Sequence, residues 1–430
     1  MLTKEDAELI MRVGPGTPMG DLIRRTWIPA CLSEELPAPD CDPIRVRLLG
    51  EDLVAFRDST GQIGVLGEHC PHRNASLFFG RNEAGGLRCL YHGWKFDVSG
   101  NVLETPCEPA ESRMRFHVKQ TAYPVVEQGD VVWIYMGPRD KQPPFPNFWW
   151  TMVAPESRSV GEINYACNYV QSIEGAIEHI HGDVLHSGHE LMGWTPEQIR
   201  RLDPAYYGFR PAARNYVFQD TPYGFRFAGI KPMDDDQQAV NVTPFIVPFH
   251  IMLSSSPHMF VPMDDEHTWY FDVRASATHA VDQAKALAER GEVVGIDVDP
   301  NHRKFRTMAN NFMQDRQAMR EKREHWSFSG IPWGKPHQDM LMIETMGPLT
   351  DWMTEHLGQA DVVVAHMRQR MVEAARRYME TGEVGEVDAS IPLDRVRGGG
   401  GVIPSDAPWQ SVSAFADEWE PSQHSPAAVR

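Results

Sequence analysis

Short alternating runs of hydrophobic and polar residues dominate the first third of the chain. Three such runs cover residues 44–49, 53–58 and 63–68, and turn-forming residues separate them. Alternation with a period of two, bounded by Gly, Ser and Asp, is typical of β-hairpins. Similar runs follow at residues 94–98, 101–104, 125–128 and 131–137. The pattern therefore predicts a small all-β unit from about residue 26 to residue 137.

Other patterns flank this unit. Residues 3–12 have helical spacing, with Thr3 as the N-cap and Asp6 three residues later, so they predict a short helix. The stretch 138–148 contains four prolines, which predict a stiff connection between two domains.

The second half mixes helical and strand patterns. Helical spacing occurs at residues 168–189, 279–291, 301–323 and 360–380, whereas 207–275 contains strand-like runs such as 223–230 and 241–253. This order predicts a domain in which an antiparallel sheet grips a helix. The tail from Thr381 is rich in Gly, Pro, Ser and acidic residues, and we expect an irregular arm that buries little.

We therefore predict an α+β protein, with an N-terminal all-β domain and a C-terminal helix-grip domain. Its 430 residues are too many for one ordinary core. The predicted divisions are an N-terminal helical arm, a β domain with its linker, a second domain and a C-terminal extension, over residues 1–25, 26–148, 149–380 and 381–430.

Composition and charge narrow the function. With 59 acidic against 41 basic residues, the formal charge of −18 repels nucleic acid and anionic membrane surfaces, so we expect neither as a partner. The mean hydropathy is −0.41, and no apolar run approaches the length that spans a bilayer. The N-terminus mixes charges into its apolar residues, unlike a secretory signal. We expect a cytoplasmic protein.

Two Cys-His pairs stand in the β domain, Cys70-Pro71-His72 and Cys89-Leu90-Tyr91-His92. A [2Fe–2S] centre with two Cys on one iron and two His on the other needs such pairs from two adjacent loops. Zinc is an alternative, although its common spacing pairs Cys with Cys, and so are four unrelated buried residues. The stretches CPHR and CLYHGWKFD resemble the two loops of a Rieske domain. The resemblance implies that Cys70 and Cys89 hold one iron, and His72 and His92 the other.

Residues 168–189 contain four histidines and several carboxylates. A non-haem Fe²⁺ site needs two imidazoles and one carboxylate on one face of the ion. His181 and His186 lie about 140° apart on an ideal helix, so they share an ion only if the helix is distorted, as Gly182 permits. His186 is better aligned with His179 or His189. Spacing alone leaves the pair open.

The chain resembles the oxygenase components of Rieske non-haem iron ring-hydroxylating enzymes, most closely the phthalate 4,5-dioxygenase type. The resemblance covers about residues 10–380 and includes the segments 11–27, 42–58 and 338–358, together with an Asn-x-x-Gln-x-x-Glu-Gly motif from residue 168. It implies that His181, His186 and Asp339 bind a mononuclear Fe²⁺. Asp183 and Asp351 are the alternatives for the carboxylate.

The resemblance also implies roles for two further residues. Relatives usually carry an Asp three residues before the first iron ligand, where this chain has Glu178. In trimers of the family this carboxylate bridges a cluster-ligating histidine of one subunit and an iron-ligating histidine of the next, although a surface Glu is the alternative here. We expect a catalytic role for Glu178 and for Asn168, which opens the motif.

The resemblance implies a terminal oxygenase that uses O₂ and electrons from a separate NAD(P)H reductase, with a flavin and/or a ferredoxin. It also implies a homotrimer or hexamer and an aromatic carboxylic acid substrate, oxidised by ring dihydroxylation or by monooxygenation with O-demethylation or ether cleavage. No dinucleotide-binding GxGxxG pattern occurs in the chain. The alternative function is a non-catalytic Rieske electron-transfer protein with a ligand-binding helix-grip domain. The basic residues 201, 210, 214 and 231 are candidates to pair with a substrate carboxylate, and we assign none of them.

Overall fold

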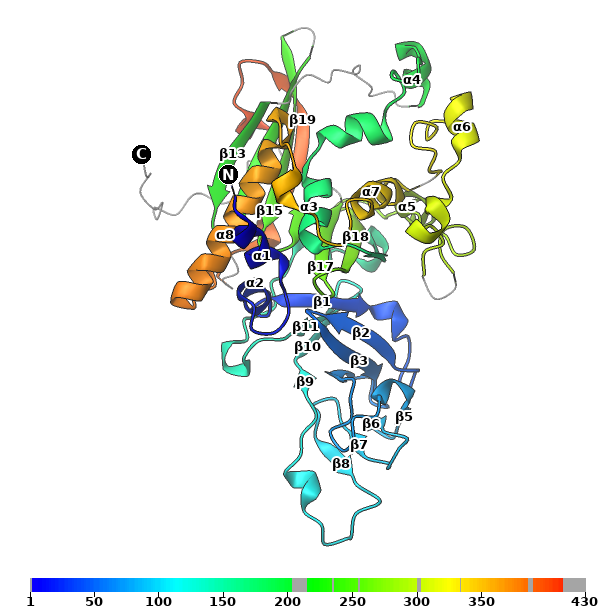
Figure 1. Cartoon of the computed structure of the whole chain (residues 1–430), viewed down its shortest axis with the longest axis vertical. Coiled ribbons are helices and arrows are strands. Elements are labelled where there is room, and N and C mark those ends of the chain that lie inside the picture. The colour runs from blue at the N-terminus through cyan, green and yellow to red at the C-terminus, as the bar shows by residue number, and fades with distance from the viewer. Residues whose placement is uncertain are drawn as a thin grey trace.

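The structure is a computed structural model that describes residues 2–202, 215–233, 236–253, 256–299, 303–332, 334–385 and 390–412. Figure 1 shows an elongated molecule. The strands of the first third of the chain form its lower part, and a large sheet with several helices forms its upper part. This arrangement confirms the predicted α+β class with an N-terminal all-β domain.

Three small antiparallel sheets make up the N-terminal domain. The first has the order β1 (Trp27–Leu32), β11 (Val131–Tyr135) and β10 (Val125–Gln128). The second has the order β2 (Ile44–Leu48), β3 (Glu51–Arg57), β4 (Ile63–Gly67) and β9 (Ala122–Tyr123). The third has the order β5 (Arg81–Glu83), β6 (Gly86–Arg88), β7 (Lys95–Phe96) and β8 (Val102–Glu104). Each alternating run of the sequence thus corresponds to a strand.

One large antiparallel sheet dominates the second half. Its strands follow the order β12 (Arg158–Tyr165), β18 (Thr268–Ala275), β17 (Pro257–Pro262), β16 (His250–Met252), β15 (Gln237–Ile246), β14 (Gly224–Pro232) and β13 (Asn215–Thr221). The helix α3 (Tyr169–Ile177) packs against β16, β17 and β18. On its other sides α3 contacts α7 (Lys335–Glu344) and α8 (Val362–Thr381). This is the predicted helix-grip arrangement.

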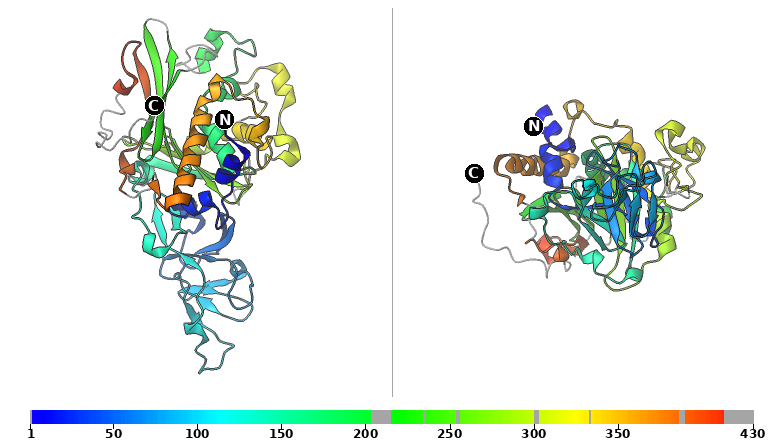
Figure 2. Two further views of the ribbon diagram at one scale, coloured as in Figure 1. Left: turned by 60° about the vertical axis from the view of Figure 1, so that its left-hand side comes forward. Right: turned by 90° about the horizontal axis from the view of Figure 1, so that it is seen from below.

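The predicted N-terminal helix is α1 (Lys4–Met11). The backbone N–H of Asp6 donates to the Thr3 hydroxyl at 3.2 Å, and the backbone N–H of Thr3 donates to the Asp6 carboxylate at 2.8 Å, which confirms the capping pattern. Both α1 and α2 (Pro18–Ile23) pack against α8, as Figure 2 shows. The N-terminal arm is therefore part of the second domain's helical layer.

The other helices are short. They are α4 (Pro196–Leu202), α5 (Gln283–Arg290) and α6 (Arg316–Glu321). The long helix predicted over residues 301–323 is wrong, because only α6 and one 3₁₀ segment over Met308–Met313 form there among the described residues. In the second half of the 3₁₀ segment Asn311, Phe312 and Met313 have positive φ angles of 53°, 53° and 51°, which interrupt a right-handed helix.

Part of the C-terminal tail joins the large sheet, contrary to our expectation of an irregular arm. The strand β19 (Gly399–Pro404) pairs antiparallel with β15 over residues 237–242. Beyond it, Trp409 and Val412 are buried against Val240 and Val242. The division of the chain at residues 25, 148 and 380 remains a prediction.

Candidate metal centres

The two Cys-His pairs lie in neighbouring loops of the N-terminal domain. Cys70 and His72 follow β4, and Cys89 and His92 lie between β6 and β7. In the second loop the backbone N–H of Gly93 donates to the carbonyl of Cys89 at 3.0 Å. Gly93 has a φ of +73°, which residues with a side chain rarely adopt. The glycine of this loop therefore permits the tight turn that carries His92.

In space the four predicted ligands form one pair of cysteines and one pair of histidines. The side chains of Cys70 and Cys89 adjoin each other in the core, and burial, followed by the nearby Cys89 thiol, raises the pKa of Cys70 to about 11. The imidazole rings of His72 and His92 are partly exposed, with centroids 4.4 Å apart. Each pair contains one residue from each loop, which is what a diiron cluster with Cys on one iron and His on the other requires.

The surroundings also fit a [2Fe–2S] cluster. The ring of His72 stacks on the buried Trp94, with centroids 4.8 Å apart and an interplanar angle of 1°, so its plane is fixed. The thiols face the interior and the imidazoles lie nearer to solvent. Because buried thiols bind iron only after losing their protons, we expect loading of the cluster to release protons and to stabilise the two loops.

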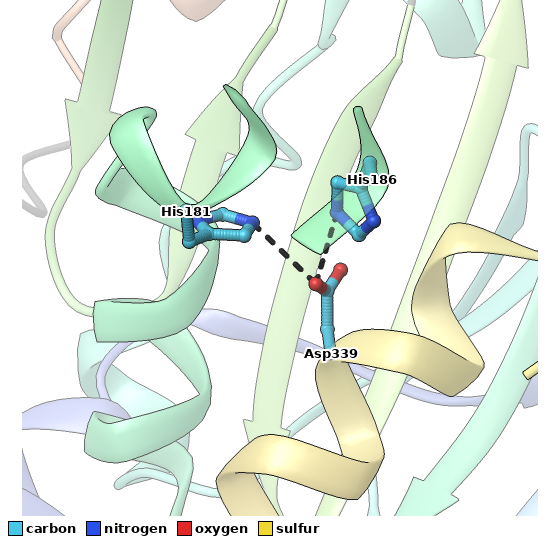
Figure 3. A group of neighbouring side chains, drawn as sticks. All are labelled: His181, His186 and Asp339. Atoms are coloured by element: carbon cyan, nitrogen blue, oxygen red, sulfur yellow. Dashed lines mark ion pairs between the residues drawn. The ribbon is translucent and has the colours of Figure 1, made fainter. Parts of the chain in front are cut away.

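Three side chains of the second predicted centre point toward one another, as Figure 3 shows. His186 Nε2 lies 3.0 Å from Asp339 Oδ1, and His181 Nε2 lies 3.4 Å from the same oxygen. One ligand atom of each residue lies within 4.8 Å of the others. Within the described ranges this is the one group of His, Cys, Asp or Glu side chains with such geometry. Two imidazoles and one carboxylate form the donor set of a non-haem Fe²⁺ site.

A distorted turn explains how two histidines five residues apart meet. The helix α3 ends at Ile177, the backbone of Glu178 is extended, and a π-helical turn follows over Gly182–His186. A π-helical turn is wider than an α-helical one and closes its hydrogen bonds over five residues. His181 and His186 consequently lie on the same side of the turn, with ring centroids 5.2 Å apart.

Hydrogen bonds orient both imidazoles. His186 Nδ1 lies 2.7 Å from Gln338 Oε1, an atom that only accepts, so this nitrogen carries the proton. His181 Nδ1 lies within hydrogen-bonding distance of the backbone carbonyl of Glu178, which is also an acceptor. In both rings Nε2 is thus the nitrogen that is left to bind a metal ion.

The charges at this centre favour a bound cation. Burial alone raises the pKa of Asp339, but hydrogen bonds from His181 and His186 outweigh it and hold that pKa well below its usual range. Burial likewise lowers the pKa of His181, but Asp339 and Glu178 outweigh it and raise this pKa to about 10. Without a metal ion the group therefore holds a proton beside a half-buried carboxylate, and a divalent cation can replace that proton.

A cavity of about 920 Å³ opens beside the three residues. Apolar and aromatic side chains form much of its wall, among them Tyr165, Phe260, Tyr270 and Ile343. The rings of Phe260 and Tyr270 are stacked, with centroids 4.8 Å apart and an interplanar angle of 16°. A cavity of this size and lining is typical of a small-molecule site.

The alternative ligands lie outside the group. Asp183 lines the cavity but does not belong to the three converging side chains. Asp351 caps a short helix by accepting a hydrogen bond from the backbone N–H of Met353 at 3.0 Å. His179 and His189 also lie outside the group. Of the combinations that spacing left open, the geometry favours the one that the resemblance implied.

Glu178 lies directly behind His181. Its carboxylate accepts hydrogen bonds from the backbone N–H groups of Ile180 and His181, the latter at 2.8 Å, and its Oε2 lies 3.4 Å from His181 Nδ1. Burial alone raises the pKa of Glu178, but the hydrogen bonds from His181 and Ile180 outweigh it and lower the pKa below its usual value. Glu178 is therefore ionised at neutral pH and fixes the turn that carries the first histidine.

The placement of Asn168 favours a structural role, so the catalytic role that we expected stays a prediction. Its side chain is fully buried as the N-cap of α3 and accepts from the backbone N–H of Val170 at 3.0 Å. It also donates to the carbonyls of Met11 and Asp265, at 2.9 Å and 2.7 Å. Asn168 is not among the residues that line the cavity. The sequence motif placed it near the histidines, but its contacts join α3 to the N-terminal arm.

We expect the substitution Asn168→Ala to lower stability while sparing turnover. The variant loses the cap and leaves the buried carbonyl of Met11 and the partly buried carbonyl of Asp265 without this donor, so the free energy of unfolding should fall by about 1–3 kcal/mol. Urea unfolding measures this loss, and O₂ uptake per bound iron measures turnover. A drop of more than about tenfold in turnover with unchanged stability would restore a catalytic assignment.

The cavity wall also contains a polar network that the sequence patterns did not predict. The buried Asp272 accepts hydrogen bonds from Tyr270 at 3.0 Å and from Arg274 at 2.6 Å, and the hydroxyl of Ser256 lies 2.8 Å from His258 Nε2. These residues come from the neighbouring strands β17 and β18 and from the residue just before β17. Their alternation on two strands was the available signal, but an alternating pattern does not distinguish a cavity wall from a core face.

Of the basic residues that we considered for a carboxylate, Arg201 and Lys231 are described, and neither is among the residues that line the cavity. Arg201 is exposed and pairs with Glu197 on α4 at 2.9 Å, and Lys231 lies near the end of β14. Arg210 and Arg214 lie outside the described residues.

In the described part of the chain no helix is both long enough and apolar enough to cross a bilayer.

Comparison with known proteins agrees with both centres. Residues 26–124 match the Rieske [2Fe-2S] domain family, and residues 134–427 match the family described as LigXa C-terminal domain like. The chain is 38% identical to the phthalate 4,5-dioxygenase oxygenase subunit of Pseudomonas putida, with 96% of this chain and 95% of that protein covered. It is 33% identical to the 5,5'-dehydrodivanillate O-demethylase oxygenase subunit of Sphingobium sp., with 92% and 84% covered.

The fold is also found in a solved structure. The crystal structure of dicamba monooxygenase bound to dicamba covers 84% of this chain and 99% of its own, with a TM-score of 0.56 and 16% identity. With two domain families matched along its length and full-length relatives above 30% identity, the chain belongs to the Rieske non-haem iron oxygenases, as an oxygenase component of the phthalate 4,5-dioxygenase type.

Proposed function

We propose that this oxygenase component takes electrons from a separate NAD(P)H reductase, with a flavin and/or a ferredoxin, and uses O₂ to oxidise an aromatic carboxylic acid. The outcome is ring dihydroxylation, or monooxygenation with O-demethylation or ether cleavage. Relatives named for phthalate and for dehydrodivanillate support this range. A cytoplasmic location belongs to the same proposal, because NAD(P)H is the ultimate reductant.

In this proposal Cys70, Cys89, His72 and His92 hold the Rieske cluster, and His181, His186 and Asp339 hold the mononuclear iron. When bound, the Fe²⁺ offers open positions for O₂ activation and the cluster supplies electrons one at a time. The observation that carries the proposal is the convergence of two Nε2 atoms and one carboxylate oxygen at the wall of a large cavity. A purely electron-transferring protein has no need of that second donor set.

The residues of the cavity suit a flat substrate. The stacked rings of Phe260 and Tyr270 provide an apolar face, and Ile343 adds an aliphatic side chain from the helix that carries Asp339. Binding of an aromatic ring there displaces water from the space beside the iron ligands. Asp272 and Arg274 place hydrogen-bonding side chains on one wall of the cavity, where they can orient a polar substituent of the substrate.

Assembly into a homotrimer or hexamer is part of the proposal. The histidine end of the cluster faces the surface, and the neighbouring residues Leu90 and Tyr91 are 61% and 57% exposed. Exposed apolar side chains beside a redox centre are typical of a surface that docks with another protein. In a trimer this surface would face the catalytic domain of the next subunit, where Glu178 would bridge the two centres.

Metal analysis and oxygen uptake test this function together. The purified protein should contain about three irons per chain, two in a red-brown cluster and one alone. It should consume O₂ only when reductase and an aromatic acid are both present, and mass spectrometry of the products should then identify the oxidised position. Two irons per chain with no uptake for any acid would instead match the electron-transfer alternative, and a colourless zinc protein would contradict both.

A further inference from the structure

Gln338 lies between an iron ligand and the protein backbone. Its Oε1 lies 2.7 Å from His186 Nδ1, and its Nε2 donates to the carbonyl of Ile331 at 3.2 Å. The residue is 7% exposed and occupies the first half of α7, immediately before Asp339. One helix therefore supplies both a ligand and the group that orients a second ligand.

The bond to Ile331 fixes which end of the amide faces the imidazole. If the amide were reversed, its oxygen would face the Ile331 carbonyl and its NH₂ group would face the imidazole. Only the observed orientation satisfies both partners, since a carbonyl oxygen accepts and an NH₂ group donates. Oε1 therefore faces His186, and His186 is held in the form that carries its proton on Nδ1 and a lone pair on Nε2.

The two imidazoles differ in what holds them. His181 Nδ1 faces the main-chain carbonyl of Glu178, which every residue type supplies, and the Glu178 carboxylate lies 3.4 Å from the same nitrogen. The partner of His186 is a side chain that a substitution can remove. The partner is also uncharged, whereas a carboxylate in this position would push more electron density onto the metal through the imidazole.

From these contacts we propose that Gln338 is a positioning residue, which fixes the tautomer and ring plane of His186 and thereby sets the affinity and electronic character of the mononuclear iron. The proposal rests on the assignment of that iron to His181, His186 and Asp339. It predicts that the side chain at position 338 tunes the iron without touching the substrate or the cluster.

Two substitutions at position 338 distinguish the orienting effect of the side chain from an effect of its charge. Gln338→Leu removes the acceptor, so Fe²⁺ affinity should fall by about 10–100-fold while the visible spectrum of the cluster is unchanged. Gln338→Glu keeps an acceptor and adds charge, so iron should stay bound, and the electron paramagnetic resonance signal of the ferrous centre with nitric oxide as a probe should shift. Equilibrium dialysis of cluster-loaded, iron-depleted protein against Fe²⁺ measures the affinity directly.

Gln171→Leu is the matched control. Gln171 is a buried glutamine of α3 whose amide donates to the Gly347 carbonyl at 2.8 Å and accepts from the Thr350 N–H at 2.9 Å, so it holds only backbone groups. Its loss should lower stability but leave Fe²⁺ affinity and the nitric oxide signal as in the parent protein.

The outcomes are distinct. Equal weakening of Fe²⁺ binding in the Gln338→Leu and Gln171→Leu variants would overturn the proposal, since general loosening would then explain it. If Gln338→Leu does not fold, the Gln338→Glu variant decides, and an unchanged affinity and signal there would likewise overturn it. A parent protein that binds no third iron would instead contradict the proposed function itself.

Discussion

Replacing Asp339 with alanine should remove the mononuclear iron and abolish substrate-dependent oxygen uptake. Asp339 is the one carboxylate in the converging group of the described residues, and without it two neutral imidazoles remain to bind a divalent cation. We expect iron to fall from about three to about two per chain. Turnover should fall by more than about 100-fold, because even residues that only support metal ligands account for 10–100-fold. Metal analysis, the visible spectrum and O₂ uptake measure the three quantities.

Asp183→Ala is the matched control for this experiment. Asp183 is also a carboxylate that lines the cavity, and it lies between the two histidines in sequence, but it is outside the converging group. Its substitution should leave about three irons per chain and an unchanged cluster spectrum. If iron instead stays in the Asp339→Ala variant and leaves the Asp183→Ala variant, the carboxylate ligand has been assigned to the wrong residue.

Local patterns of the sequence predicted the elements that depend on local physics. The strands β2, β3 and β4 form at the predicted runs, because the runs favour β structure and turn residues separate them, although β3 and β4 are buried on both faces rather than on one. The capping pair of Thr3 and Asp6 forms as predicted because both partners lie within one helical turn. The two Cys-His loops could also be identified from the sequence, since each supplies two ligands within three or four residues.

The iron ligands needed more than local patterns. His181 and His186 converge because the chain leaves the α-helical form at Glu178 and then forms a π-helical turn. That break is stabilised by hydrogen bonds from Ile180 and His181 to the Glu178 side chain, and no periodicity encodes it. Asp339 comes from a helix more than a hundred residues later, so only resemblance to a family pointed to it.

The strand β19 shows a second limit of pattern reasoning. Four consecutive glycines, Gly398 to Gly401, have no side chains and therefore no alternation to detect, and β19 begins within this run. On one edge of β15, the short strand β16 pairs only with Phe245 and Ile246, and β19 pairs along the rest, over residues 237–242. The open edge of another strand, rather than the tail's own sequence, selects the conformation of the tail.

Exchange of one carboxylate for an amide tests the proposed path of electrons between the two centres. The substitution Glu178→Gln should leave both metals bound and slow electron transfer from the reduced cluster to the iron by about 10–100-fold. Glu178 is ionised and touches His181, so in an assembled trimer its negative charge can hold a histidine of the neighbouring cluster in line with this ligand. A glutamine is neutral and has one acceptor oxygen. Reduced enzyme mixed rapidly with O₂ and substrate reports the rate through the returning colour of the oxidised cluster.

The alternative role of Glu178 is that of a capping residue, because its carboxylate accepts two backbone hydrogen bonds. Asp315→Asn controls for that role, since Asp315 also accepts two, from Gln317 at 2.9 Å and Ala318 at 2.8 Å, but lies at the start of α6 and is not among the residues lining the iron cavity. The two bonds of Glu178 go to Oε1 and Oε2, so glutamine loses one acceptor, whereas both bonds of Asp315 go to Oδ1, which asparagine keeps. We therefore expect a larger loss of stability in the Glu178→Gln variant, and the Asp315→Asn variant shows the effect of removing the charge of a capping carboxylate alone. If cluster reoxidation is as fast in the Glu178→Gln variant as in the Asp315→Asn variant, Glu178 only shapes the turn and the electrons cross between subunits by another contact.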